Sequence, residues 1–198
     1  LKACAERGWL KEITKPCDPN LEIPEIHART VAKGGPALLF KNPLGSDFPL
    51  VTNLFGTPER VALAFGDRPK QLVRELAETA EKFLPPKLSK LWNARHLGMQ
   101  LLRTGLKQVA GAPITELGPQ VPAFNRLPAT TSWPEDGGPF ITLPLVYSEH
   151  PRSGKHNLGM YRMQIHSAQT TGMHWQIHKG GGFHFHEAER LGQNLPLC

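Results

Sequence analysis

Glycine and proline interrupt this 198-residue sequence throughout, with 19 residues of each. They recur as turn dipeptides and do not follow the strict three-residue period of collagen. They break the chain into short predicted elements, and no apolar stretch approaches the ~18 residues that a membrane-spanning helix needs. With 39% hydrophobic and 20% charged residues, the composition excludes a disordered tail or a fibre.

The first half of the sequence alternates predicted helices with short apolar strands. A helix closes at Gly8, and Thr57 with Pro58 supplies a capping residue and a first-turn proline for a later one. Strands are predicted over 10–14, 37–40 and 48–54, and helices over 21–33, 57–65, 69–83 and 88–109. In the helix over 57–65, the residues expected to face a core are Val61, Leu63, Ala64 and Phe65.

The second half begins with a proline-rich segment over 111–139, for which we expect an ordered connector. Strands are predicted again over 140–147, 158–166 and 173–178, followed by a helix over 183–191. The sequence therefore predicts a mixed α/β (α+β) fold. An N-terminal α/β domain would occupy 1–112, and a connector with the first part of a β-rich domain would occupy 113–198.

Both ends of the sequence predict that it belongs to a longer protein. The chain starts at Leu1, without methionine, inside a predicted helix. It ends on an apolar run, 195–198, that is typical of the opening of a strand.

The net charge limits the classes of ligand that the protein could bind, and the cysteine usage indicates its compartment. The net charge is +6, yet lysine and arginine are scattered without a run of five, which disfavours nucleic acid. A small phosphate-bearing ligand or peripheral contact with an anionic membrane surface stays open, with an ordinary soluble basic enzyme preferred over the membrane. Cys4, Cys17 and Cys198 are odd in number and far apart, which predicts reduced thiols in a cytoplasmic protein and no zinc site.

Four histidines cluster near the end of the chain. His174 and His178 would share one face of a helix and could then bind zinc. The apolar residues at 173, 175 and 177 alternate with them, however, and predict a half-buried strand. On a strand the two imidazoles lie about 13 Å apart, so a zinc cluster that also uses His184 and His186 is disfavoured.

His178 precedes Lys179 and the three glycines 180–182, with a predicted helix after them. Backbone N–H groups at a helix N-terminus bind anions, so a phosphate site with a metal-bound histidine is chemically coherent. A flexible glycine loop is the simpler interpretation, and both stay open.

Asn157 and Arg162 form the second polar pair of interest. In an ideal strand they face opposite sides, and they converge only if Asn157 precedes the strand or Gly159 forms a bulge. Arg162 is either a solvated strand residue or a planar guanidinium that binds a carboxylate.

Five blocks in order resemble the UbiD family of decarboxylases, and the resemblance covers essentially the whole chain. The blocks are Gly34-Gly35-Pro36-Ala37-Leu38-Leu39-Phe40, Asn53-Leu54-Phe55-Gly56-Thr57, Trp133-Pro134-Glu135-Asp136, Asn157-Leu158-Gly159-Met160-Tyr161-Arg162 and His178-Lys179-Gly180-Gly181. The resemblance implies that 113–198 begins a split β-barrel flavin-binding domain. It also implies that family members are longer than this chain.

The resemblance implies reversible, non-oxidative decarboxylation of an aromatic or conjugated acid with prenylated FMN, Mn²⁺ and K⁺. Asn157 and His178 match two metal ligands, and amide oxygen and imidazole suit a manganese-type ion. Arg162 matches the catalytic arginine that engages the substrate carboxylate. The remaining cofactor-binding positions implied by the resemblance are Leu158, Gly159, Met160, Tyr161 and Ile177, with Arg162 and His178 also near the cofactor.

The family's third metal ligand and the glutamates of its catalytic network would lie beyond Cys198. The resemblance favours quinone biosynthesis, ubiquinone or menaquinone, and a homo-oligomer. Two alternatives stay open. The chain could be a non-catalytic flavin- or phosphate-binding module, or an assembly subunit that needs a second chain.

Overall fold

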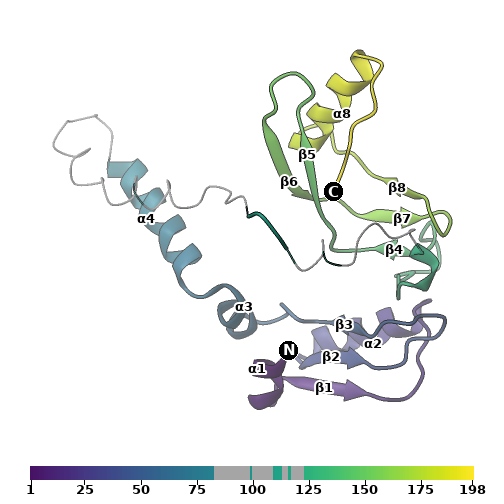
Figure 1. Ribbon diagram of the computed structural model, residues 1–198. Helices are drawn as coiled ribbons and strands as arrows, with labels where there is room; N and C mark the ends of the chain where they lie inside the picture. The colour runs from purple at the N-terminus through teal and green to yellow at the C-terminus, as the bar shows by residue number, and fades with distance from the viewer. Residues whose placement is uncertain (83–98, 100–108, 113–115, 117–122) are drawn as a thin grey trace. The chain divides into compact units, whose positions relative to one another are not determined.

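A computed structural model describes residues 1–82, 99, 109–112, 116 and 123–198 (Figure 1). The chain divides into two compact units: Leu1–Leu54 with Val121–Cys198, and Phe55–Gln120. The helix predicted over 88–109 lies almost entirely outside the described residues, as does part of the connector. The fold is mixed α/β, as the sequence predicts.

The N-terminal part of the first unit is a three-stranded sheet in the order β1-β2-β3. Helix α1 (Lys2–Glu6) precedes β1 (Leu10–Ile13), and α2 (Glu22–Ala32) connects it to β2 (Ala37–Phe40). Strands β1 and β2 are parallel, and β3 (Leu50–Thr52) runs antiparallel to β2. The strands and the helix predicted in this segment are confirmed.

The apolar core of this sheet lies on its central strand. All four residues of β2 are buried, because the strand has a neighbour on each edge. Phe40 and Ile23 are completely buried and pack with Leu38 and Cys17. Removing these side chains from water stabilises the fold by about 1.5–3 kcal/mol for each large residue.

The second unit contains α3 (Pro58–Phe65) and α4 (Arg68–Lys82). Thr57 caps α3 as predicted, since its side chain accepts the N–H of Arg60. The expectation that Val61, Leu63, Ala64 and Phe65 of α3 face a core is wrong. Val61 and Phe65 are exposed, and Phe65 contacts the ring of Phe55 with centroids 5.5 Å apart. Helical spacing specifies a common face but not the surface that covers it.

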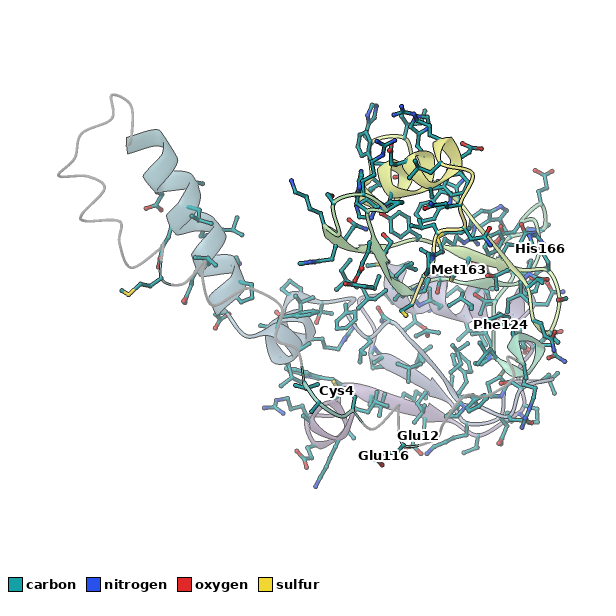
Figure 2. The ribbon with its side chains drawn as sticks, turned by 45° about the horizontal axis from the view of Figure 1, so that its top comes forward. Cys4, Glu12, Glu116, Phe124, Met163 and His166 are labelled. Atoms are coloured by element: carbon teal, nitrogen blue, oxygen red, sulfur yellow. The ribbon has the colours of Figure 1, made fainter. Side chains whose placement is uncertain are left out.

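Two small antiparallel sheets form the C-terminal part of the first unit. One contains β4 (Phe140–Ile141), β7 (Met163–Ile165) and β8 (Thr171–Met173), and the other is a hairpin of β5 (Leu145–Glu149) and β6 (His156–Met160). Figure 2 labels Met163 at the start of β7, His166 directly after its end, and Phe124 of the short helix η1 (Phe124–Arg126). The N–H of Phe124 donates to the carbonyl of Ala168 in the turn between β7 and β8.

Helix α8 (Gly180–Arg190) packs on β5 and β6 (Figure 1). Arg152, in the hairpin turn, forms an ion pair with Glu187 of α8 at 2.5 Å. Leu197 forms an antiparallel β-bridge with Ser148 on the free edge of β5. The apolar run over 195–198 is therefore extended, as predicted.

Three predicted elements of this half differ from the structure. The strand over 140–147 is divided into β4 and β5, and the strand over 158–166 is divided at Tyr161 and Arg162 into β6 and β7. The strand over 173–178 is wrong beyond Met173, because the next five residues form no strand. The sheets of the described residues do not close into a barrel.

No helix in the part of the chain that the structure describes is long and apolar enough to cross a membrane. All three cysteines are free, with Cys4 and Cys17 buried.

Candidate functional site

The two faces of the β5–β6 hairpin differ in what covers them. In the register Ser148 lies opposite Asn157, and Val146 lies opposite Gly159. This face packs against α8. Leu158 and Met160 belong to the opposite face, and each is more than half exposed. The residues of β6 predicted to bind the cofactor therefore alternate between the face that packs against α8 and the exposed face.

Tyr161 joins the end of β6 to the start of α8. Its ring is buried, and its hydroxyl accepts the N–H of Gly181 at 2.8 Å and a side-chain N–H of Asn157 at 3.2 Å. Trp175 packs edge-on against the Tyr161 ring with centroids 5.0 Å apart. These contacts fix where the first turn of α8 lies relative to β6.

The three glycines form the first turn of α8 and are tightly packed, so the flexible-loop interpretation is wrong. A Cβ atom on Gly180 would lie 2.9 Å from Asn157 Cγ, and the amide oxygen is closer still. A Cβ on Gly181 would lie 2.7 Å from the Tyr161 hydroxyl, and one on Gly182 would lie 2.7 Å from the carbonyl of Gln176. Only glycine allows this approach without displacing its neighbours.

Asn157 and His178 approach the same end of α8 from different elements. Asn157 lies within β6 in an unbulged register and meets Gly180, whereas His178 lies in the exposed turn two residues before that glycine. Neither route predicted for the convergence of Asn157 with Arg162, a loop position for Asn157 or a bulge at Gly159, is used, because Asn157 lies within β6 in a regular register.

Arg162 follows β6 and binds a carboxylate of its own chain. Its Nη1 donates to Asp136 Oδ1 at 3.1 Å, and its Nη2 donates to Oδ2 at 2.5 Å. The guanidinium carbon lies 3.5 Å from the centroid of the Phe140 ring and 5.0 Å from that of Trp133. The hydrogen bonds from Arg162 hold the pKa of Asp136 below its usual value of 3.8, so the carboxyl is ionised at neutral pH.

Sequence reasoning missed Asp136 as a partner of Arg162. The block Trp133–Asp136 was part of the family resemblance, but its aspartate received no role. The two residues are 26 positions apart, so no local spacing could have paired them. The best available signal was an acidic residue in a proline-containing turn of a motif that also contains tryptophan.

The histidines are dispersed. His184 is buried and its Nδ1 lies 3.0 Å from the hydroxyl of Ser148, whereas His174, His178 and His186 are exposed. Burial and the neighbouring His150 lower the pKa of His184. No group of three or more His, Cys, Asp or Glu side chains among the described residues could hold a metal ion.

Two models of known protein families match this chain. The model of the 3-octaprenyl-4-hydroxybenzoate carboxy-lyase N-terminal domain matches residues 1–80. The model of the Rift-related domain of the same carboxy-lyase matches residues 107–198. The chain belongs to the UbiD family.

Relatives in this family include proteins of Chlamydia. An uncharacterized protein of Chlamydia muridarum is 50% identical over 189 residues, and a Chlamydia pneumoniae protein named as a subunit of 4-hydroxybenzoate decarboxylase is 46% identical over 188 residues. Each alignment covers 95% of this chain and 32% of the relative. The chain thus spans about a third of the length of the curated UbiD relatives that it matches.

Among solved structures, an evolved dimeric form of the UbiD-class enzyme HmfF from Pelotomaculum thermopropionicum superposes with a TM-score of 0.75. Its sequence is 26% identical, and the match covers 99% of this chain and 42% of that one. This HmfF structure is a complex with prenylated FMN, and a second HmfF structure is a complex with FMN. The fold of this chain is therefore similar to that of the matching part of a UbiD-class enzyme.

Proposed function

We propose that this chain supplies cofactor-binding and carboxylate-binding residues of a decarboxylase that acts on an aromatic or conjugated acid with prenylated FMN. One observation carries the proposal: β6 contacts the glycine-rich start of α8 through Asn157, and the arginine that follows β6 lies between aromatic rings. The HmfF complexes with prenylated FMN and FMN support the choice of cofactor. The Chlamydia pneumoniae relative named for 4-hydroxybenzoate decarboxylase supports the choice of reaction.

The residues at the start of α8 fit a phosphate and a metal ion. Asn157 and His178 offer one oxygen and one nitrogen ligand, a set that suits Mn²⁺ better than a thiolate-seeking ion. The close approach of Gly180 places the Asn157 amide against the helix N-terminus. The helix dipole favours an anion there, while the N–H groups of Gly181, Gly182 and Phe183 already donate to Tyr161 and Lys179. Asn157 and His178 would hold Mn²⁺ and, through it, the flavin phosphate, with K⁺ nearby.

The exposed apolar side chains beside this site fit a flat ring. Leu158, Met160 and Ile177 are 55%, 56% and 82% exposed, although all three are large and apolar. Such exposure is costly in water and is relieved by contact with an apolar ligand surface. In this proposal the flavin contacts these exposed side chains, Gly159 and Tyr161 on the other face hold β6 against the start of α8, and Arg162 follows at the end of β6.

Prenylated FMN, when bound, supplies the electron-accepting group that makes loss of CO₂ from such an acid feasible. Arg162 binds the substrate carboxylate and orients it, because its planar guanidinium matches a carboxylate bidentately. The ring of Phe140 lies 3.5 Å from the guanidinium carbon and that of Trp133 lies 5.0 Å from it, so both rings are within the range of a cation–π interaction with Arg162.

We also propose a physiological setting. We place the reaction in quinone biosynthesis, since the matching family models carry the name of the 3-octaprenyl-4-hydroxybenzoate carboxy-lyase. We also propose a cytoplasmic homo-oligomer, in agreement with the dimeric HmfF form. The naming of the Chlamydia pneumoniae relative as one subunit of a decarboxylase favours instead an assembly with a second chain, which is the alternative.

The test measures CO₂ release from 4-hydroxybenzoate and related aromatic acids by the full-length protein with prenylated FMN and Mn²⁺. We expect activity in the wild type, loss of at least about 100-fold in Arg162→Ala, and near-normal activity in Arg126→Ala. Arg126 is the matched control, because it forms an exposed pair with Asp47 away from α8. Near-normal activity of Arg162→Ala would refute the assigned role, and no CO₂ release from any tested acid by the wild type would refute the reaction.

A further inference from the structure

The guanidinium of Arg162 is only partly used by Asp136. A guanidinium carries five N–H donors in one plane. Asp136 takes one N–H from each terminal nitrogen through its two oxygens. The Nε–H and one N–H on each terminal nitrogen therefore remain for another acceptor. The side chain of Arg162 is 31% exposed, so an incoming ligand can reach it.

Asp136 is the fixed member of this pair. Its side chain is 3% exposed, and its Oδ2 also accepts the backbone N–H of Ser132 at 3.1 Å. Its own N–H donates to the carbonyl of Trp133 at 3.0 Å, which closes a tight turn. Because the turn immobilises the carboxylate, Asp136 determines the direction of the guanidinium plane, rather than following it.

The aromatic rings limit the approach to Arg162 further. Phe140 lies 3.5 Å from the guanidinium carbon, a stacking distance, and Trp133 lies within cation–π range at 5.0 Å. A carboxylate must therefore approach in the guanidinium plane, along the edge that Asp136 leaves open. A flat ring attached to that carboxylate would meet aromatic surface on arrival.

We propose that Asp136 is the positioning residue of Arg162: it occupies the edge formed by the two terminal nitrogens and leaves the adjacent edge, formed by Nε–H and one terminal N–H, for the carboxylate of a planar acid. This inference deepens the proposed function and rests on it for the substrate class. Asp136 also neutralises much of the positive charge, so Arg162 discriminates by geometry more than by net attraction. The opposite possibility, that Asp136 merely competes with the ligand, predicts tighter binding when it is removed.

The experiment measures binding of benzoate to the full-length protein by calorimetry, with benzamide as the uncharged comparison. We expect the wild type to bind benzoate in preference to benzamide. Asp136→Asn should weaken benzoate binding by about tenfold or more, because the amide no longer holds both terminal nitrogens. Asp47→Asn is the matched control, since it removes an exposed aspartate paired with Arg126, and it should change binding by less than about twofold.

Asp136→Glu keeps the charge and shifts it by one methylene, and we expect intermediate affinity. This variant decides the question if Asp136→Asn does not fold. For an acid that the protein decarboxylates, KM should rise in folded Asp136→Asn if Asp136 positions Arg162. If Asp136 has only a structural role, the active fraction should fall and KM should stay unchanged.

The possible results separate the two proposals. Benzoate binding in Asp136→Asn equal to or tighter than in the wild type would overturn the positioning role, as would a wild type that does not distinguish benzoate from benzamide. If the wild type binds benzoate and releases no CO₂ from any acid, the proposed reaction fails, and the affinity ratio between the variants still decides the role of Asp136.

Discussion

The N-terminal sheet and the β5–β6 hairpin with α8 are held together by different interactions. In the N-terminal sheet, all four apolar residues of β2 are buried, Leu38 and Phe40 pack with Ile23 of α2, and Phe40 and Ile23 have no exposed surface. In the hairpin region, hydroxyl, amide and imidazole groups meet glycines at the start of α8 or the inner face of β5. We conclude that apolar burial stabilises the first region, whereas polar contacts and close backbone approach shape the second.

This difference suits two separate tasks, stability in the N-terminal sheet and ligand binding in the hairpin region. Polar groups that are already hydrogen-bonded and fixed can bind a charged ligand with little reorganisation. An apolar core has no such polar groups. Because it is closely packed, substituting a large side chain by a small one there destabilises the fold. The predictions below test whether stability and ligand binding separate between the two regions.

The largest effect is expected in the N-terminal sheet. Phe40→Ala leaves a cavity beside Ile23 and Leu38, and we expect the free energy of unfolding to fall by about 3–5 kcal/mol. Urea unfolding measures this loss. The remaining folded molecules should bind FMN like the wild type, so a loss below about 1 kcal/mol, or a folded variant that no longer binds FMN, contradicts this separation of the two tasks.

A smaller effect is expected at the start of α8. Gly181→Ala places a methyl group against the Trp175 ring and 2.7 Å from the Tyr161 hydroxyl, so we expect a loss of about 1–3 kcal/mol and weaker FMN binding. Gly111→Ala is the control, because a Cβ there meets no atom of the described residues within 4 Å. Equal stability of the two variants in urea would show that the glycines of α8 are not closely packed.

The smallest effect is a dependence on pH that is confined to the hairpin region. Burial and His150 hold the pKa of His184 below 6.5, so the folded protein keeps this imidazole neutral against the hydroxyl of Ser148. The resulting stability is fully present above pH 6.5 and is lost as the pH falls through the lowered pKa. Thermal melting at pH 7.5 and 5.5 should therefore show a larger decrease for the wild type than for His184→Gln. Identical decreases would remove His184 as the cause.

The sequence predicts the apolar region well and the polar region in part. The buried strand over 37–40 and the capped helix at Thr57 depend on neighbours in sequence, and both are confirmed. The strand over 173–178 fails because Trp175 leaves the sheet and packs between Tyr161 and Phe185, and Ile177 is left exposed. Alternation of apolar residues describes periodicity but not which tertiary contact each residue finds.

The candidate site shows the same limit. Motif order pointed to Asn157, Arg162 and His178, because the family resemblance rests on residue identity rather than on geometry. The pairing of Arg162 with Asp136 and the contact of Asn157 with Gly180 join distant segments, and no local pattern reports them. The site residues remain predictions, and the structure supplies the contacts with which to test them.

The central claim is that β6 and the start of α8 form one site for a metal ion and a flavin phosphate. The most direct test is a titration of the full-length protein with FMN, with and without Mn²⁺, followed by flavin fluorescence. We compare the wild type, Asn157→Ala, and the control Asn42→Ala, whose amide contacts only the carbonyl of Thr14 in the described hydrogen bonds. The account predicts Mn²⁺-dependent FMN binding that Asn157→Ala weakens by about tenfold or more and Asn42→Ala leaves unchanged. Equal affinity in all three proteins, or binding that ignores Mn²⁺, would contradict it.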